Sequence, residues 1–193
     1  SNAIFYQEIT PGDRSDVVFR NICLSNMKAI ENTMNMLDTD KFEQAVQLLC
    51  RAKRVDFYGV GTSALVALDA HNKFLRTGKM VMANADYHVQ LLSAASLKKN
   101  DVAVLISYSG ETYDIIRMAS LVKRTGCKLI AITSYTKNSL SKFADVILYT
   151  VSAETMIRSG AISSRIAQLT IIDALYTAVC SNMYDSVKSQ LDK

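Results

Sequence analysis

The stretch "DVAVLISYSGET", residues 101–112, joins an apolar segment to a loop rich in hydroxyl groups. The apolar run is typical of a strand that helices cover on both faces. The loop then gathers three hydroxyls around one glycine, directly before a segment with helical spacing: Ser107, Ser109, Gly110 and Thr112. The stretch therefore predicts a strand, a turn and the start of a helix, which is the repeating unit of a parallel α/β sheet.

Four further segments repeat this pattern of a short apolar strand. They are "VDFYGVG" (55–61), "KMVMAN" (79–84), "KLIAITS" (128–134) and "DVILYT" (145–150). Gly78 and Gly126 stand where two intervening helices should end, because glycine readily adopts the left-handed conformation that closes a helix. We therefore expect an α/β fold, a three-layer α/β/α sandwich with a five-stranded parallel sheet in the flavodoxin-like order 2-1-3-4-5.

Helices are expected at both ends of this core. Apolar residues recur at helical spacing over 15–37, and Asp40 with Glu43 resembles a capping box that starts a second helix ending near Ala52. The apolar pattern of the final segment indicates one long helix or two. The expected division is an expression scar over 1–3 and a single domain over 4–193, made of an N-terminal helical extension (15–52), an α/β core (53–150) and C-terminal helices (154–191).

Composition argues against several classes of protein. No apolar run approaches the roughly 18–20 residues that a transmembrane helix needs, so no membrane partner is expected. The four cysteines lack CxxC spacing, which indicates free thiols in a reducing cytoplasm. The net charge is only +4, and the densest basic group, "RAKR" at 51–54, suits a helix C-terminus. Direct nucleic-acid contact is not expected. The two histidines, His71 and His88, are scattered and predict no metal site.

Two loops at the carboxyl ends of neighbouring strands form the candidate site. Ligands of doubly wound sheets bind at the switch in strand order, which here would set "GVGTS" (59–63) beside "SYSGET" (107–112). Free N–H groups at a helix N-terminus suit an anion, and Gly110 would let the backbone approach it. No loop residue is basic, which argues against a nucleoside triphosphate with Mg²⁺. One serine could be a simple helix cap, but three hydroxyls and a glycine beside a second glycine–serine loop favour a bound phosphate.

A dinucleotide enzyme is an alternative interpretation of the first loop. "GVGTSA" (59–64) fits the fingerprint GxGxxG/A between a strand and a helix. The acid that should follow about 20 residues later is displaced, because Asp86 lies 27 residues past Gly59. This alternative also leaves "SYSGET" without a role, so it ranks second to a phosphate site without a cofactor.

The two loops together resemble those of the sugar isomerase (SIS) domain, a phosphosugar-binding module. "SYSGET" is similar to its serine-rich phosphate loop, and "GVGTS" to its glycine–serine loop. "HNKFLRTGK", "DYHVQ" and above all "RSGAISSRIAQLTIIDALY" (158–176) resemble the effector domain of RpiR-type transcription regulators. The resemblance covers about residues 20–185. It implies a sensor whose N-terminal helix-turn-helix (HTH) DNA-binding domain is absent from this sequence, so that DNA would be bound only through that domain.

The resemblance also implies roles for individual residues. The phosphate would be held by Ser107, Ser109 and Thr112, with backbone help from Gly110 and Glu111. Phosphate or sugar hydroxyls would be contacted by Ser63 with Gly61 and Thr62, and the remaining candidate sugar contacts are Tyr108 and Glu154. Glu154 stands where isomerases of this family place a carboxylate base.

Several of these residues have simpler explanations. Glu154 could equally be a solvated acid before the last helix. Arg158 and Arg165 share a helix face, where surface or interface packing competes with a place at the ligand mouth. Asp86 and His88 could cap and begin a short helix. Tyr58 and Tyr108 could be packing residues beside strands.

A sensor and an aldose–ketose isomerase both fit the loops. Isomerisation needs a base beside the reacting carbons and a group that assists ring opening. Glu154 could be the base, but no histidine or lysine is identifiable as the helper. The resemblance of "ISSRIAQLTIIDALY" to the RpiR effector domain is the main reason to expect a sensor and no enzyme, with residual isomerase activity left open. The terminal helices are apolar enough for a homodimer or homotetramer, and ligand binding would shift them to reposition the DNA-binding domains.

Overall fold

A computed structural model of the chain describes residues 9–152 and 162–191. Its five strands are β1 (Arg54–Gly59), β2 (Met80–Met82), β3 (Val102–Ile106), β4 (Lys128–Ser134) and β5 (Val146–Thr150). All neighbours are parallel, in the order β2-β1-β3-β4-β5. The predicted flavodoxin-like sheet is therefore confirmed. β1 and β3 end level with each other, since Gly59 pairs with Ile106.

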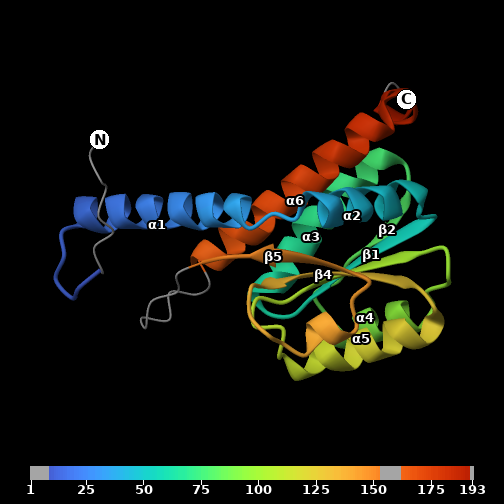
Figure 1. Cartoon of the computed structure of the whole chain (residues 1–193), viewed down its shortest axis with the longest axis horizontal. Helices are drawn as coiled ribbons and strands as arrows, with labels where there is room; N and C mark the ends of the chain where they lie inside the picture. The colour runs from blue at the N-terminus through green and yellow to red at the C-terminus, as the bar shows by residue number, and fades with distance from the viewer. Residues whose placement is uncertain (1–8, 153–161, 192–193) are drawn as a thin grey trace.

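Helices alternate with these strands and cover both faces of the sheet (Figure 1). They are α1 (Ser15–Asn35), α2 (Thr39–Arg51), α3 (Thr62–Phe74), α4 (Tyr87–Ala95), α5 (Tyr113–Thr125), α6 (Ile162–Asn182) and α7 (Tyr184–Leu191). Short 3-10 turns are η1 (Leu75–Thr77) and η2 (Leu140–Lys142). Gly78 and Gly126 end η1 and α5 with φ of 73° and 76°, as predicted from the sequence.

Two apolar cores result from the alternation of side chains along the strands. In β3, Val104 and Ile106 pack with α2, α3 and α6, whereas Ala103 and Leu105 pack with α4, α5 and η2. All four side chains are fully buried. The sheet is therefore the middle layer of three, and its carboxyl edge remains open between the layers.

The start of α2 differs from the prediction. Asp38, not Asp40, is the N-cap: its Oδ1 accepts a hydrogen bond of 3.0 Å from the Lys41 N–H. Glu43 does not reach back to the helix start, because its Oε1 accepts from Gln47 Nε2 at 2.8 Å. The capping box is wrong by two residues, since the chain leaves the extended conformation immediately after Asp38.

Within the described ranges, no helix has the length and apolar character needed to cross a membrane.

Candidate functional site

The two predicted loops meet at the carboxyl edge of the sheet around a hollow of about 230 Å³. We call it the switch-point hollow. Its lining comes from both loops, from the starts of α3 and α5, and from one residue of α6: Val60, Thr62, Ser63, Ile106, Ser107, Tyr108, Ser109, Thr112, Ile115 and Ser164. Two larger hollows, of about 420 and 400 Å³, lie at the β4–η2 loop and beside the C-terminal end of α1. Neither of these hollows is lined by residues from both loops.

The first loop turns sharply from β1 into α3. A Cβ on Gly59 would lie 2.4 Å from the Ser63 carbonyl oxygen, so only glycine allows α3 to start this close to the strand. Gly61 is the N-cap with φ of 62° and no side-chain cap. The Ala64 N–H donates to the Gly61 carbonyl oxygen at 3.1 Å, which leaves the N–H groups of Thr62 and Ser63 for a ligand at this end of the helix.

The second loop is ordered by its own hydroxyls. Ser107 Oγ accepts from the Gly110 N–H, and Ser109 Oγ accepts from the Glu111 N–H, both at 3.2 Å. Each hydroxyl keeps its proton for another acceptor. Thr112 is the N-cap of α5, yet its side chain makes no cap hydrogen bond. A simple helix cap therefore does not explain Thr112.

Gly110 packs closely against the β4–η2 loop. It adopts φ of 63°, and a Cβ there would lie 2.3 Å from Asn138 Cγ. This close approach by itself requires glycine at position 110. The Glu111 side chain also contacts the β4–η2 loop, because its Oε1 accepts a hydrogen bond from the Ser139 N–H at 2.7 Å. Neither residue lines the switch-point hollow.

The hollow is lined by no charged side chain from the described ranges. The N-termini of α3 and α5 lie at this hollow, where helix dipoles place partial positive charge and N–H groups that favour an anion. Hydroxyls supply the remaining donors: Thr62, Ser63, Ser107, Ser109, Thr112 and Ser164. This arrangement suits a small anion carrying several oxygen acceptors.

Tyr108 and Ser164 extend the lining beyond the two loops. The Tyr108 hydroxyl donates to the Ser152 carbonyl at 3.0 Å, and Tyr108 lines both the switch-point hollow and the 400 Å³ hollow. Ser164 lies in the first turn of α6. Sequence reasoning did not select it as a site residue, although the serine pair in "AISSR" was the available signal.

Other predicted candidates lie elsewhere. Asp86 is the N-cap of α4, accepting from the Val89 N–H at 3.0 Å, which leaves the dinucleotide fingerprint without its acid. His88 is exposed and His71 half-buried, and neither lines the hollow. Arg165 is half-buried on α6, also outside the lining. Glu154 and Arg158 lie outside the described residues. Among the described residues, no group of three His, Cys, Asp or Glu side chains could hold a metal ion.

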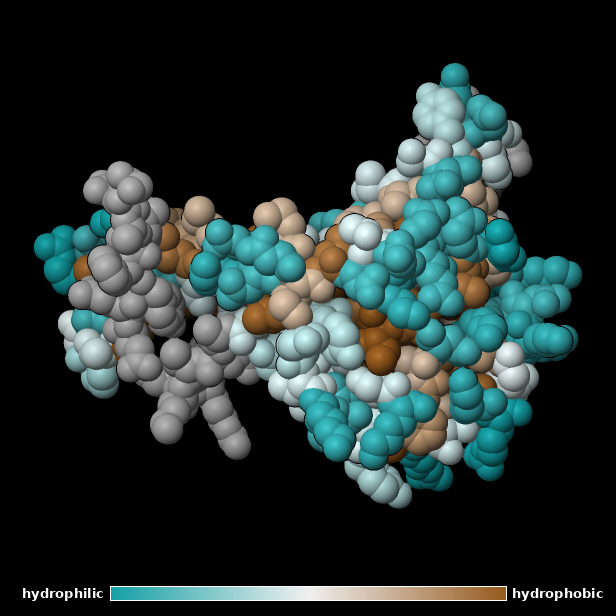
Figure 2. All heavy atoms as spheres, viewed as in Figure 1, coloured by the Kyte–Doolittle hydropathy of each residue, from teal (hydrophilic) through white to brown (hydrophobic). Residues whose placement is uncertain are grey.

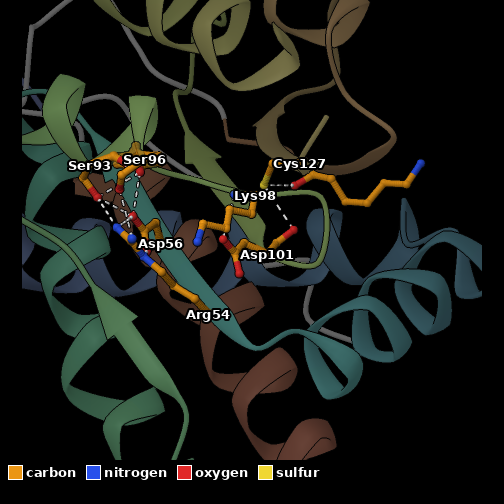
Figure 3. A network of polar contacts seen from close by, with 9 residues as sticks. Arg54, Asp56, Ser93, Ser96, Lys98, Asp101 and Cys127 are labelled. Atoms are coloured by element: carbon orange, nitrogen blue, oxygen red, sulfur yellow. Dashed lines mark hydrogen bonds and ion pairs between the residues drawn. The ribbon is translucent and has the colours of Figure 1, made fainter. Parts of the chain in front are cut away.

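A buried polar network joins β1 to α4 behind the first loop (Figure 3). Asp56 is fully buried and accepts two hydrogen bonds of 2.7 Å from Arg54, one of 2.7 Å from the Tyr58 hydroxyl and a short one from Ser93. Burial, followed by the charge of Asp56, raises the pKa of Tyr58, so the phenol stays protonated. Tyr58 is thus a packing and network residue and does not line the hollow.

Gln90, which lies on α4 like Ser93, ties this helix to the first loop. It is 1% exposed, and its Nε2 donates to the carbonyls of Gly59 at 2.9 Å and Asn84 at 2.8 Å. Sequence reasoning missed both Gln90 and Asp56. An acid inside the apolar run "VDFYG" was the visible signal, because a charge is rarely buried without a partner.

Comparison with known proteins identifies the family of this chain. The family model described as SIS domain matches residues 48–178. An uncharacterized HTH-type transcriptional regulator of Caldanaerobacter subterraneus subsp. tengcongensis is 41% identical over 184 residues, which cover 95% of this chain and 65% of that protein. The chain thus spans about two thirds of the length of that curated relative.

Solved structures share the fold. Vibrio vulnificus NanR in complex with ManNAc-6P superposes with a TM-score of 0.83 at 22% identity, covering 94% of this chain and 68% of that one. The sugar isomerase domain of an RpiR transcription factor from Sphaerobacter thermophilus gives 0.82 at 17%, covering 91% and 96%. A Listeria monocytogenes protein assigned as a sugar-phosphate isomerase gives 0.77 at 20%, covering 90% and 94%. With the family model matched across the sheet and both loops, the chain belongs to the SIS domain family.

Proposed function

We propose that this chain is the phosphosugar-sensing effector part of an RpiR-type transcription regulator. The observation that carries the proposal is the convergence of two helix N-termini and six hydroxyls on one hollow with no charged lining among the described residues. Such a cradle suits a phosphate, because each hydrogen bond to a charged group contributes about 1.5–3 kcal/mol. The longer HTH-type relative supports the regulatory context.

In this proposal the phosphate lies against the second loop. Ser107, Ser109 and Thr112 donate hydroxyls to it, with the backbone of Gly110 and Glu111 closing the turn. The sugar extends toward the first loop, where Gly61, Thr62 and Ser63 begin α3, and toward Tyr108, with Glu154 as a further candidate. We add Ser164 to this set, because it lines the same hollow from α6.

An aldose–ketose isomerase remains the competing function, because SIS-type structures assigned as isomerases share this fold. No carboxylate or imidazole from residues 9–152 or 162–191 lines the hollow. Proton transfer between two sugar carbons needs such a base within hydrogen-bond reach. The hollow offers binding groups without a described base, which favours a sensor that does not turn its ligand over.

The regulator would act in the cytoplasm as a homodimer or homotetramer, and DNA would be bound through an HTH domain outside this chain. Phosphosugar binding would shift the balance between two arrangements of the subunits. A ligand can do so only by the difference in its affinity for the two arrangements.

A thermal-shift panel tests the proposal. Phosphosugars, their unphosphorylated parents and NAD(P) are compared, and every compound that stabilises the protein is checked for conversion. A specific phosphosugar at a hundred times its Kd should add about 2.7 kcal/mol of stability, without product. Ser109→Ala together with Thr112→Val should abolish this shift, whereas Ser181→Ala, an exposed serine near the end of α6, should keep it. Stabilisation by NAD(P) alone, or conversion of the sugar, would refute the sensor.

A further inference from the structure

We propose that the sensed molecule is a phosphorylated disaccharide: its phosphate lies in the switch-point hollow, and its second, uncharged sugar ring lies in the neighbouring hollow of about 400 Å³. We call this neighbouring space the side hollow. The inference rests on the proposed function, because it keeps the phosphate in the switch-point hollow. It goes further by naming the class of ligand and the groups that bind its uncharged part.

The side hollow meets the switch-point hollow at Tyr108. This residue lines both spaces, and its hydroxyl donates to the Ser152 carbonyl at 3.0 Å, so the side chain is anchored where the two spaces meet. The remaining walls come from the last turn of α1, and from the ends of β4 and β5 with the residues that follow them. A ligand whose phosphate lies against the second loop therefore has room to extend past Tyr108.

The volumes indicate that one ligand occupies both spaces. Most sites for small molecules have volumes of roughly 300–1,000 Å³. The switch-point hollow, at about 230 Å³, is smaller than this range. The side hollow is the larger of the two, at about 400 Å³, and the two together fall well within the range. The larger space is thus left for the part of the ligand that carries no phosphate.

The lining of the side hollow suits an uncharged group. No charged side chain of the described ranges lines it, whereas Lys137 and Lys142 line the separate hollow of about 420 Å³. A second phosphate or a carboxylate would therefore have no cation beside it. Figure 2 shows pale atoms, of intermediate hydropathy, below the C-terminal end of α1.

The polar groups of the side hollow match sugar hydroxyls. Asn32 and Asn35 lie three residues apart on one face of α1, and both line the hollow. Their carboxamides make no hydrogen bond within the described part of the chain. The Ser152 hydroxyl oxygen is buried there, also without a partner among the described residues. Carboxamides and hydroxyls offer both donors and acceptors, as a sugar hydroxyl requires.

Tyr135 supplies an aromatic surface for the sugar ring. It lines the side hollow, is 60% exposed, and is held by an edge-to-face contact with Tyr149 at a centroid distance of 5.0 Å. The C–H face of a sugar ring is apolar and packs on such an aromatic ring, while the hydroxyls at its edge reach the polar groups around it. An aromatic ring beside uncharged carboxamides and hydroxyls therefore favours a sugar as the occupant.

Isothermal titration calorimetry with matched probes tests the ligand class. Glucose 6-phosphate is compared with cellobiose 6′-phosphate, maltose 6′-phosphate and trehalose 6-phosphate, and galactose 6-phosphate with lactose 6-phosphate. At least one disaccharide phosphate should bind about tenfold or more tightly than the phosphohexose it contains, because two further hydrogen bonds contribute about that much. If no disaccharide phosphate has this advantage, the inference is wrong, whether the phosphohexoses bind or not. Binding of a phosphohexose alone would leave the proposed function intact.

Variants of the side hollow test the contacts. Asn32→Ala with Asn35→Ala should remove the advantage of the disaccharide phosphate and leave the affinity for the phosphohexose unchanged. This variant should fold, because alanine is the better helix former. Asn100→Ala is the matched control, since Asn100 is exposed and precedes β3 at the opposite edge of the sheet. Equal losses for both probes would overturn the assignment of these carboxamides to the second ring.

A mixture of separate sugars tests whether the two units are joined. Two linked groups bind more tightly than the same groups apart, because the second binds at a high effective concentration. Glucose 6-phosphate with free glucose should therefore bind no more tightly than glucose 6-phosphate alone. If the mixture matches the disaccharide phosphate, the side hollow binds a separate sugar and the inference of one joined ligand is wrong.

Discussion

Gly110 offers a sharp test of how the serine-rich loop is held. Gly110→Ala adds a Cβ that would lie 2.3 Å from Asn138 Cγ, at a residue with φ of 63°. Gly126 separates the two effects, because it has φ of 76° and no atom within 4 Å of its added Cβ. Gly126→Ala should therefore cost only the left-handed strain, about 1–2 kcal/mol.

Gly110→Ala should cost the same strain plus the overlap, which in packed interiors is about 1–3 kcal/mol. We expect a total of about 2–5 kcal/mol, which for a chain of this length lowers the melting temperature by about 2–4 °C for each kcal/mol. Asn138 cannot simply swing aside. Its Nδ2 donates to Thr133 Oγ1 at 3.2 Å, and its Oδ1 accepts from the Ser141 N–H at 3.1 Å.

Urea denaturation of the two glycine variants, of Asn138→Ala and of the double variant Gly110→Ala/Asn138→Ala measures each contribution. Removing the Asn138 side chain should recover much of the overlap cost, so the double variant should be more stable than the sum of the single effects. If Gly110→Ala costs no more than Gly126→Ala, the Asn138 contact is not what requires glycine, and the loop is held differently.

Three further perturbations probe other parts of the molecule. Asp56→Asn should destabilise by about 3–5 kcal/mol, as measured by urea denaturation, because it leaves the partly buried Arg54 guanidinium without its fully buried counter-charge; a loss below 1 kcal/mol would contradict the network. Burial raises the pKa of the Cys127 thiol to about 12. Unfolding then releases its proton more easily, so this group's contribution to stability should fall as pH rises above about 9, and Cys127→Ala should flatten that part of the pH profile. Burial alone would raise the pKa of Asp145, but the Leu129 N–H and nearby lysines hold it below its usual value. Its contribution is present above about pH 4 and lost on acidification, so Asp145→Asn should weaken the acid dependence of unfolding.

The sheet could be predicted from the sequence because each strand is an apolar run bounded by glycine or a polar turn. Helix ends at glycine, as at Gly126, could be predicted equally well. The start of α2 could not, because Asp38 and Asp40 are both suitable N-cap residues by composition. Which of the two aspartates caps the helix depends on the path of the backbone, which the surrounding fold determines.

The candidate site, too, could be predicted only in part. The two loops could be paired from the strand order alone, because neighbouring parallel strands end at one edge. The role of Gly110 could not be inferred this way, because Asn138 is 28 residues away in sequence and its contact depends on how the β4–η2 loop folds back. The contact of Gln90 with the first loop could not be predicted for a similar reason, because its hydrogen-bond partner is the backbone carbonyl of Gly59, 31 residues away in sequence.

The helix α6 connects the switch-point hollow to the helices on one face of the sheet. Its first turn lines the hollow with Ser164, and its 21 residues run beside α1, α2 and α3. Because α1 packs against α6, a ligand that moves the start of α6 would also displace α1. Only a ligand whose contacts with Ser164 differ between two positions of α6 would transmit a signal this way. Ser164→Ala should therefore weaken the effect of the phosphosugar on subunit association more than it weakens phosphosugar binding, and equal losses in the two measurements would place the coupling elsewhere.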